Sequence, residues 1–187
     1  EHRYEILDRV TGTVINALPG DPIEFIMEAL SDNDRQFLME RHLVSRELCE
    51  SETGAAVFVA DGERCSIMVN EEDHLRMQAI RPGLALSEAY ELVSGIDTQL
   101  EGSLDFAFDH ELGYISACPT NFGTGMRASV MLHLPGLVLS DQIGQVLQAV
   151  GKLQLAVRGY FGEGTKSLGN LFQISNQSTL GESEETI

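Results

Sequence analysis

Three short strings in this 187-residue chain combine residue types that could do chemistry. The first, residues 70–76 (NEEDHLR), has three consecutive acidic residues, then a histidine and an arginine. A carboxylate here could act as a general base or hold a cationic substrate, and Arg76 could bind an anion. A solvated acidic turn with a local Arg–Asp ion pair is the structural alternative. A divalent metal site fits less well, because one contiguous tripeptide cannot direct all its carboxylates at one ion.

The second string, residues 118–127 (CPTNFGTGMR), begins with a thiol at the end of a predicted strand. A proline and two glycines then favour a turn, and Arg127 lies on the next predicted strand. Threonine and asparagine side chains in such a turn can donate hydrogen bonds to a thiolate or to an anion. The alternative is a small buried cysteine before an ordinary turn.

The third string, residues 158–167 (RGYFGEGTKS), is rich in glycine. Glycines let backbone N–H groups approach phosphates closely, so an anion-binding loop with Arg158 at its base is one interpretation. The order of residues 164–167 (GTKS) does not match a P-loop, and the string is not a GxGxxG motif that opens a helix. A mobile surface loop is the alternative.

Composition restricts the classes of partner. The chain has 29 acidic and 12 basic residues, a formal net charge of −17, which excludes most non-specific DNA binders and disfavours anionic membranes. Arginine makes up ten of the 12 basic residues, which is typical of phosphate or carboxylate binding, although compositional bias is the alternative. Three cysteines without CxxC spacing indicate neither a disulfide framework nor a zinc site, so we expect a reducing cytoplasm.

Hydrophobic periodicity predicts an α+β fold with a mostly antiparallel sheet flanked by helices. Two β-hairpins are predicted, at residues 55–69 around Asp61-Gly62 and at residues 104–117. Further strands are predicted at residues 126–134, 155–157 and 171–175, and helices at residues 21–30, 32–42, 84–100, 140–153 (capped by Ser140) and from 181 onward. The first 20 residues are poorly periodic. In the strand at 126–134, alternation places Arg127, Ser129 and Met131 on one face.

Taken together, the three strings resemble the phosphagen kinases, the ATP:guanidino phosphotransferases. NEEDHLR is followed by CPTNxGT and then by RASV, and the resemblance covers the chain from about His42 onward. The later strings RGYFGEG and GNLFQISNQ resemble more narrowly the bacterial protein-arginine kinase branch. Small-molecule members of the family tend to carry another arginine where this chain has Phe161, which favours the protein-directed branch.

The resemblance implies a phosphagen-kinase/glutamine-synthetase-like catalytic domain that binds ATP, with Mg²⁺ held through the nucleotide phosphates and no metal ligand of its own. It implies that Glu72 holds and deprotonates the acceptor guanidinium and that Cys118 lies beside the guanidino nitrogen. The nucleotide-binding positions that it implies are His42, Arg76, Arg127, Ala128, Ser129, Val130, Met131, Arg158, Gly159, Tyr160, Phe161, Gly162 and Glu163.

The implied activity is ATP-dependent phosphorylation of arginine side chains in proteins. A small-molecule guanidino kinase of the arginine or creatine type and an inactive fragment that binds arginine or nucleotide are the alternatives. The resemblance implies protein substrates with exposed arginine, an activator protein, stress-response protease machinery and a homodimer of the full-length protein. Neither a nucleic acid nor a membrane is an expected partner. An acidic surface would attract a cationic substrate.

One feature of the family is missing. Its Ser-x-Arg-x-Arg strand, whose arginines also hold phosphate, has no match in residues 1–41, and the nearest string, Ser45-Arg46-Glu47, lies too far along the chain. We therefore expect residues 1–187 to form a single partial catalytic domain that is truncated at its N-terminus.

Overall fold

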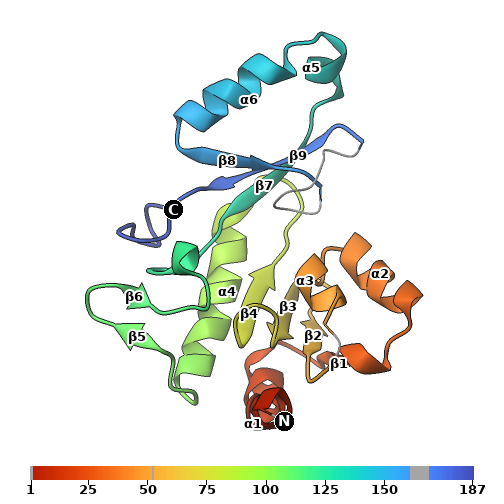
Figure 1. Ribbon diagram of the computed structural model, residues 1–187, viewed down its shortest axis with the longest axis vertical. Helices are drawn as coiled ribbons and strands as arrows, with labels where there is room; N and C mark the ends of the chain where they lie inside the picture. Colours follow the sequence, from red (N-terminus) through yellow and green to blue (C-terminus); the bar gives the residue numbers. More distant parts are fainter. Residues whose placement is uncertain (1, 52, 161–168) are drawn as a thin grey trace. The chain divides into compact units, whose positions relative to one another are not determined.

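The computed structural model describes residues 2–51, 53–160 and 169–187. The chain divides into two compact units, Glu1–Phe106 and Ala107–Ile187, and antiparallel strands form the sheets of both (Figure 1). No helix in the described ranges is long and apolar enough to cross a bilayer.

The first unit is built on a four-stranded sheet in the order β1-β2-β3-β4. Its strands are β1 (Ile23–Ile26), β2 (Ala56–Ala60), β3 (Cys65–Val69) and β4 (Leu75–Ala79). Its helices are α1 (His2–Ala17), the 3-10 turn η1 (Met27–Ala29), α2 (Asp32–Glu40), α3 (Arg46–Cys49) and α4 (Leu86–Glu101).

Strands β2 and β3 are buried along their whole length because each face of the sheet meets a layer of helices. On one face, Phe58 and its cross-strand neighbour Ile67 pack with residues of α1 and α4. On the other face, Val57 and its neighbour Met68 pack with residues from η1, α2 and α3. Burial on both sides explains why these strands read as continuous apolar runs in the sequence. It also gives the turn that follows β3 a rigid base.

The second unit contains a two-stranded ribbon and a three-stranded sheet in the order β7-β9-β8. Helix α6 packs against β8. The elements of this unit are β5 (Phe108–Asp109), β6 (Gly113–Tyr114), the 3-10 turn η2 (Pro119–Asn121), β7 (Ser129–His133), α5 (Pro135–Leu139), α6 (Ile143–Lys152), β8 (Leu155–Arg158) and β9 (Leu171–Asn176).

The predicted fold class is confirmed, as are the hairpin β2–β3, helices α2 and α4, and strands β7, β8 and β9. The predicted hairpin at residues 104–117 is present but its strands are only two residues long.

Three local predictions are wrong, and one helix, α1, was not predicted. Residues 23–26 form a strand, not a helix, because pairing with β2, in the register Ile23↔Val59, outweighs the local Asp-Pro helix signal. The poorly periodic first segment forms α1. Ser140 ends α5 rather than capping α6, and residues 181–187 form turns rather than a helix.

The two-sided burial of the sheet predicts a large effect of truncating its central aromatic side chain. Phe58 is 0% exposed, so Phe58→Ala should lower the free energy of unfolding by about 3–5 kcal/mol. The control Phe37→Ala removes a ring that is 55% exposed and should cost about 0.5 kcal/mol or less. Urea denaturation followed by circular dichroism measures both. Equal losses in the two variants would contradict the described core.

Candidate active site

The acidic string forms the turn between β3 and β4, and buried Asn70 fixes its shape. Asn70 adopts a left-handed backbone conformation (φ 59°), and its backbone N–H donates to the carbonyl of His74 at 3.0 Å. Its side-chain amide donates to the carbonyls of Arg3 (2.8 Å) and Gly54 (2.6 Å). Asparagine tolerates the left-handed region better than most residues, which explains its place here.

Glu71 points inward from this turn. Its side chain is only 4% exposed, and its Oε1 accepts a hydrogen bond from Nη1 of Arg76 at 2.7 Å. Its Oε2 accepts from the backbone N–H of Glu72 at 2.9 Å. The structure therefore pairs the enclosed Glu71 with Arg76, whose side chain is 42% exposed.

The surroundings of Glu71 keep it ionised. Burial is the largest single influence and would raise the pKa of this carboxyl. The positive charge of Arg76, a hydrogen bond from the Ser45 side chain and the bond from the Glu72 backbone together outweigh it, so the pKa lies below its ordinary value.

Glu72, the predicted base, is exposed on the same turn. The two neighbouring carboxylates thus have different environments, because Glu71 is enclosed and bonded whereas Glu72 is accessible to a substrate. Sequence reasoning chose Glu72 by resemblance and did not single out Glu71. An acidic residue five positions before an arginine was the only signal available.

His42 lies near β4, the strand that carries Arg76. It follows α2 in a left-handed conformation (φ 58°), and its carbonyl accepts a hydrogen bond from Nε2 of Gln78 at 2.6 Å. Gln78 also donates to Oγ of Ser66 at 2.9 Å, which fixes this corner of the sheet. Burial lowers the pKa of His42, so its ring is neutral at pH 7.

In the second unit, Cys118 is a half-buried free thiol immediately before η2. Its Sγ lies 3.0 Å from Oγ1 of Thr120, and its carbonyl accepts from the backbone N–H of Asn121 at 2.9 Å. The hydroxyl of Thr179 lies 3.0 Å and 2.7 Å from the carbonyl oxygens of Thr120 and Phe122. These bonds hold the turn that presents the thiol.

Close backbone packing explains the first glycine of the CPTNFGTG string. Gly123 has φ 97°, and a Cβ there would lie 2.4 Å from the carbonyl oxygen of Thr179. Only glycine fits such an approach.

The sheet of the second unit has one polar face. The register pairs Ser129 with Ser175 and places Gln173 between Met131 and Arg158, so these side chains share a face. Gln173 Nε2 donates to Oγ of Ser129 at 2.9 Å, and Arg158 donates to the hydroxyl of Ser175. The predicted alternation of β7 is therefore confirmed.

The opposite face of this sheet is apolar, with Val130, Ile174 and Val157 in register. Because Val130 points away from the polar face, only its backbone could contact a ligand bound there.

Asn176 fixes the backbone on both sides of exposed Arg127. Its Oδ1 accepts from the N–H of Ala128 at 2.9 Å, and its Nδ2 donates to the carbonyl of Met126 at 3.0 Å. The sequence pattern alone does not predict this role for Asn176.

The predicted site residues are divided between the two units. Unit 1 carries His42, Glu72 and Arg76, and unit 2 carries Cys118, residues 127–131 and residues 158–160. Phe161, Gly162 and Glu163 lie outside the described residues. Of these residues, Glu72 and Arg76 lie in the turn between β3 and β4 and on β4, and Ser129, Met131 and Arg158 share one face of the β7-β9-β8 sheet.

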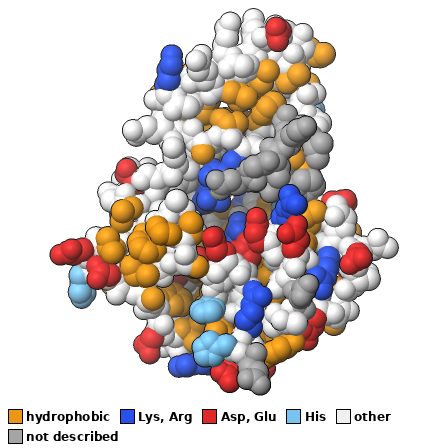
Figure 2. Space-filling model, viewed as in Figure 1, with side chains coloured by type: hydrophobic (Ala, Val, Ile, Leu, Met, Phe, Trp, Pro, Cys, Tyr) orange, Lys and Arg blue, Asp and Glu red, His pale blue; other side chains and the backbone are white. Residues whose placement is uncertain are grey.

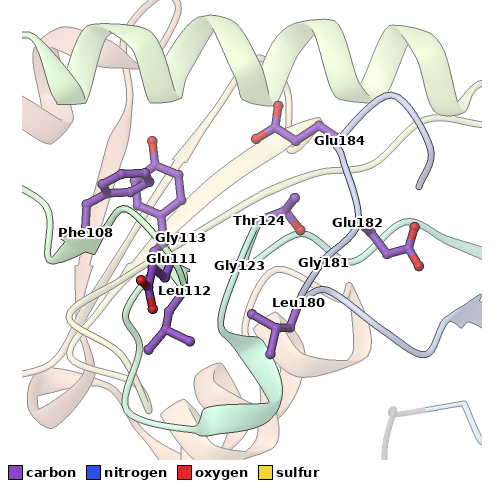
Figure 3. Close-up of a pocket in the computed structure, with 11 residues that line it drawn as sticks. Phe108, Glu111, Leu112, Gly113, Gly123, Thr124, Leu180, Gly181, Glu182 and Glu184 are labelled. Atoms are coloured by element: carbon purple, nitrogen blue, oxygen red, sulfur yellow. The ribbon is translucent and has the colours of Figure 1, made fainter.

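A cavity of about 310 Å³ lies elsewhere in the second unit (Figure 3). Phe108 and Leu112 lie on one side of it and Leu180 on the other, and the ring of Phe108 meets that of Tyr114 edge to face. None of the predicted site residues that the structure describes lines this cavity. In the described part of the chain, no group of three or more His, Cys, Asp or Glu side chains is arranged to hold a metal ion.

Comparison with protein families identifies the chain. Residues 13–187 match the model of the ATP:guanido phosphotransferase C-terminal catalytic domain. The chain belongs to this family. A protein-arginine kinase of Halalkalibacterium halodurans is 55% identical over 161 residues, which are 86% of this chain and 45% of that protein. The chain thus spans less than half the length of this curated relative.

Solved structures agree with the family. The taurocyamine kinase of Schistosoma mansoni with bound transition state analog components has a TM-score of 0.84 and 26% identity, covering 97% of this chain and 27% of that one. A lombricine kinase has a TM-score of 0.77 and 25% identity, covering 98% and 55% of the two chains. The resemblance seen in the three strings is therefore confirmed.

The pKa of Glu71 predicts a pH-dependent contribution to stability. Because this pKa is lowered on folding, the contribution is complete above the unfolded-state pKa and is lost as the pH falls through the folded-state pKa. We expect Glu71→Gln to reduce the free energy of unfolding by about 1–3 kcal/mol at pH 7. The difference from wild type should shrink as the pH falls from about 5 to about 3. Denaturation curves across this range test it, and a constant difference would contradict an ionised Glu71.

Proposed function

We propose that the protein containing this chain transfers the γ-phosphoryl group of ATP to arginine side chains in proteins. The observation that carries the proposal is the 55% identity, over 86% of the chain, to a relative named protein-arginine kinase. The chain spans only 45% of that relative. We therefore propose the activity, the substrates and the partners for the whole protein that contains this chain.

The proposed reaction needs a base at the acceptor. A guanidinium keeps its proton at neutral pH, so a nitrogen can attack only as its proton is removed. In the proposed step the nitrogen forms a bond to the γ-phosphorus, the bond from that phosphorus to the bridging oxygen of ADP breaks, and Glu72 accepts the proton. Its exposure makes Glu72 accessible for this role. A carboxylate can also orient a planar guanidinium through two parallel hydrogen bonds.

We propose Cys118 as the second group beside the acceptor. Its thiolate form would stabilise the cationic guanidinium electrostatically. The contact with Thr120 and the anchoring of η2 by Thr179 hold this sulfur in one place, which supports a positioning role.

Arginines would neutralise the phosphates. Phosphoryl transfer depends mostly on positioning and charge neutralisation, and Arg76, Arg127 and Arg158 are the proposed ligands of the nucleotide. The polar face that carries Arg158 and Ser129 supports this, as does the anchoring of the backbone around Arg127 by Asn176. The proposed nucleotide site is completed by His42, Ala128, Val130, Met131 and residues 159–163.

Mg²⁺ fits this arrangement as an ion held by the nucleotide. Protein sites for Mg²⁺ commonly combine one or two carboxylates with waters and substrate phosphates. In that mode, arginines and Mg²⁺ share the phosphate charge.

The family model spans both units, which supports the proposal that residues 1–187 form one partial catalytic domain. The net charge of −17 suits a protein substrate that presents an exposed arginine. Figure 2 shows acidic side chains intermixed with basic ones on the face in view. From the resemblance to the family we also propose an activator protein, stress-response protease machinery, homodimerisation and a cytoplasmic location.

A small-molecule guanidino kinase is the second candidate. The structural likeness to taurocyamine and lombricine kinases favours it, but those chains are 25–26% identical to this one, whereas the protein-arginine kinase is 55% identical. A fragment that binds arginine or nucleotide without transfer is the third candidate.

The full gene product should phosphorylate arginine in proteins when it is incubated with Mg²⁺, ATP and an arginine-rich protein. The expected product is acid-labile phosphate on arginine, identified by mass spectrometry. Matched reactions with free arginine, taurocyamine and lombricine serve as controls. Phosphate on a small guanidino compound alone would move the assignment to the second candidate, and binding without any transfer would support the third.

Replacement of the proposed base should separate chemistry from binding. Glu72→Gln keeps the size of the side chain but removes its proton acceptor, so kcat should fall about 10²- to 10⁴-fold. The affinity for ADP, measured by calorimetry, should change little. Glu47→Gln, at an acid on α3 outside the proposed site, is the control. A Glu72→Gln variant with wild-type kcat would remove Glu72 from the mechanism.

A further inference from the structure

The carboxylate of Glu71 joins the turn between β3 and β4 to β4 itself. Its two oxygens accept from the Arg76 guanidinium on β4 and from the backbone N–H of Glu72 in the turn. Glu71 therefore contacts both Arg76, the proposed phosphate ligand, and Glu72, the proposed base.

This ion pair differs from the others on the surface of the unit. The Arg46–Glu50 pair at 2.9 Å has side chains that are 64% and 65% exposed, and such pairs contribute little because water screens them. The Glu71 side chain is 4% exposed. A hydrogen bond to an enclosed carboxylate restricts the arginine far more strongly than a hydrogen bond to an exposed carboxylate does.

We propose that Glu71 is a positioning residue that couples the phosphate-binding Arg76 to the base Glu72. The proposal rests on the proposed function. In this account Glu71 contacts neither substrate. It holds one nitrogen of the Arg76 guanidinium and leaves the other donors to a ligand, and it fixes the backbone from which the Glu72 side chain projects.

The geometry predicts how substitutions at this position behave. Glutamine has only one acceptor oxygen, so Glu71→Gln can satisfy Arg76 or the Glu72 N–H but not both, and its NH₂ group faces a donor. Aspartate retains two acceptor oxygens and the charge but is one methylene shorter. Glu71→Asp should therefore lie between the wild type and Glu71→Gln.

The kinetic signature distinguishes coupling from a purely structural role. Loss of an Arg76 contact should raise KM for ATP, and loss of the Glu72 base should lower kcat. Glu71→Gln should do both, and kcat/KM for ATP should fall about 10- to 100-fold. Glu50→Gln, which breaks the exposed ion pair, is the matched control and should leave both constants within about twofold.

A double-mutant cycle tests the link to the arginine. If Glu71 acts on the nucleotide through Arg76, then Glu71→Gln should weaken ADP binding in the wild type but add no further loss in an Arg76→Ala background. Calorimetry with ADP measures this without any transfer reaction. The measurements use the full gene product at a temperature at which thermal unfolding shows each variant to be folded.

The outcomes are separable. A wild-type protein that binds ADP but phosphorylates no arginine would contradict the proposed function, while the ADP affinities would still decide whether Glu71 acts through Arg76. Additive losses in the cycle, or unchanged KM and kcat in a Glu71→Gln variant whose unfolding temperature alone is lowered, would overturn the positioning role. A wild-type protein that binds no ADP would overturn both proposals.

Discussion

A buried negative charge can persist only where hydrogen bonds and a counter-charge offset its lost hydration, and the turn after β3 is built around that requirement. Glu71 meets it with a guanidinium and a backbone N–H. Each of these partners loses freedom in return. The Arg76 guanidinium and the backbone of Glu72 are therefore held in the protein alone, which is the preorganisation that the proposed phosphoryl transfer requires.

The rest of the first unit gives this turn a fixed base. Strand β3 is buried on both faces, so it cannot shift relative to β2 without exposing one of the two cores. Asn70 then joins the end of the strand to α1 and to the segment before β2. In the second unit, Asn176 anchors the backbone around Arg127, and Thr179 anchors the turn after Cys118. Polar side chains that anchor the backbone beside the proposed site residues are the common feature of both units.

The sequence predicts the fold well where the pattern is local and strong. The apolar runs of β2 and β3 with Asp-Gly between them specify a hairpin, and alternation in β7 specifies its polar face. Residues 23–26 were mispredicted because their conformation is decided by pairing with β2, a partner far along the chain. The roles of Glu71 and Glu72 could not be separated from two adjacent glutamates, because burial and the ion pair with Arg76, which distinguish them, arise only in the folded turn.

The central proposal is that Arg76, Arg127 and Arg158 bind the phosphates of a nucleotide and that Glu72 and Cys118 bind the acceptor guanidinium. A crystal structure of the full gene product with ADP, Mg²⁺, a planar anion in place of the phosphoryl group and an arginine peptide tests it most directly. The account predicts Arg76, Arg127 and Arg158 within hydrogen-bond distance of the phosphates, and Glu72 and Cys118 at the peptide guanidinium. A nucleotide bound away from these arginines, or a guanidinium that touches neither Glu72 nor Cys118, would contradict it.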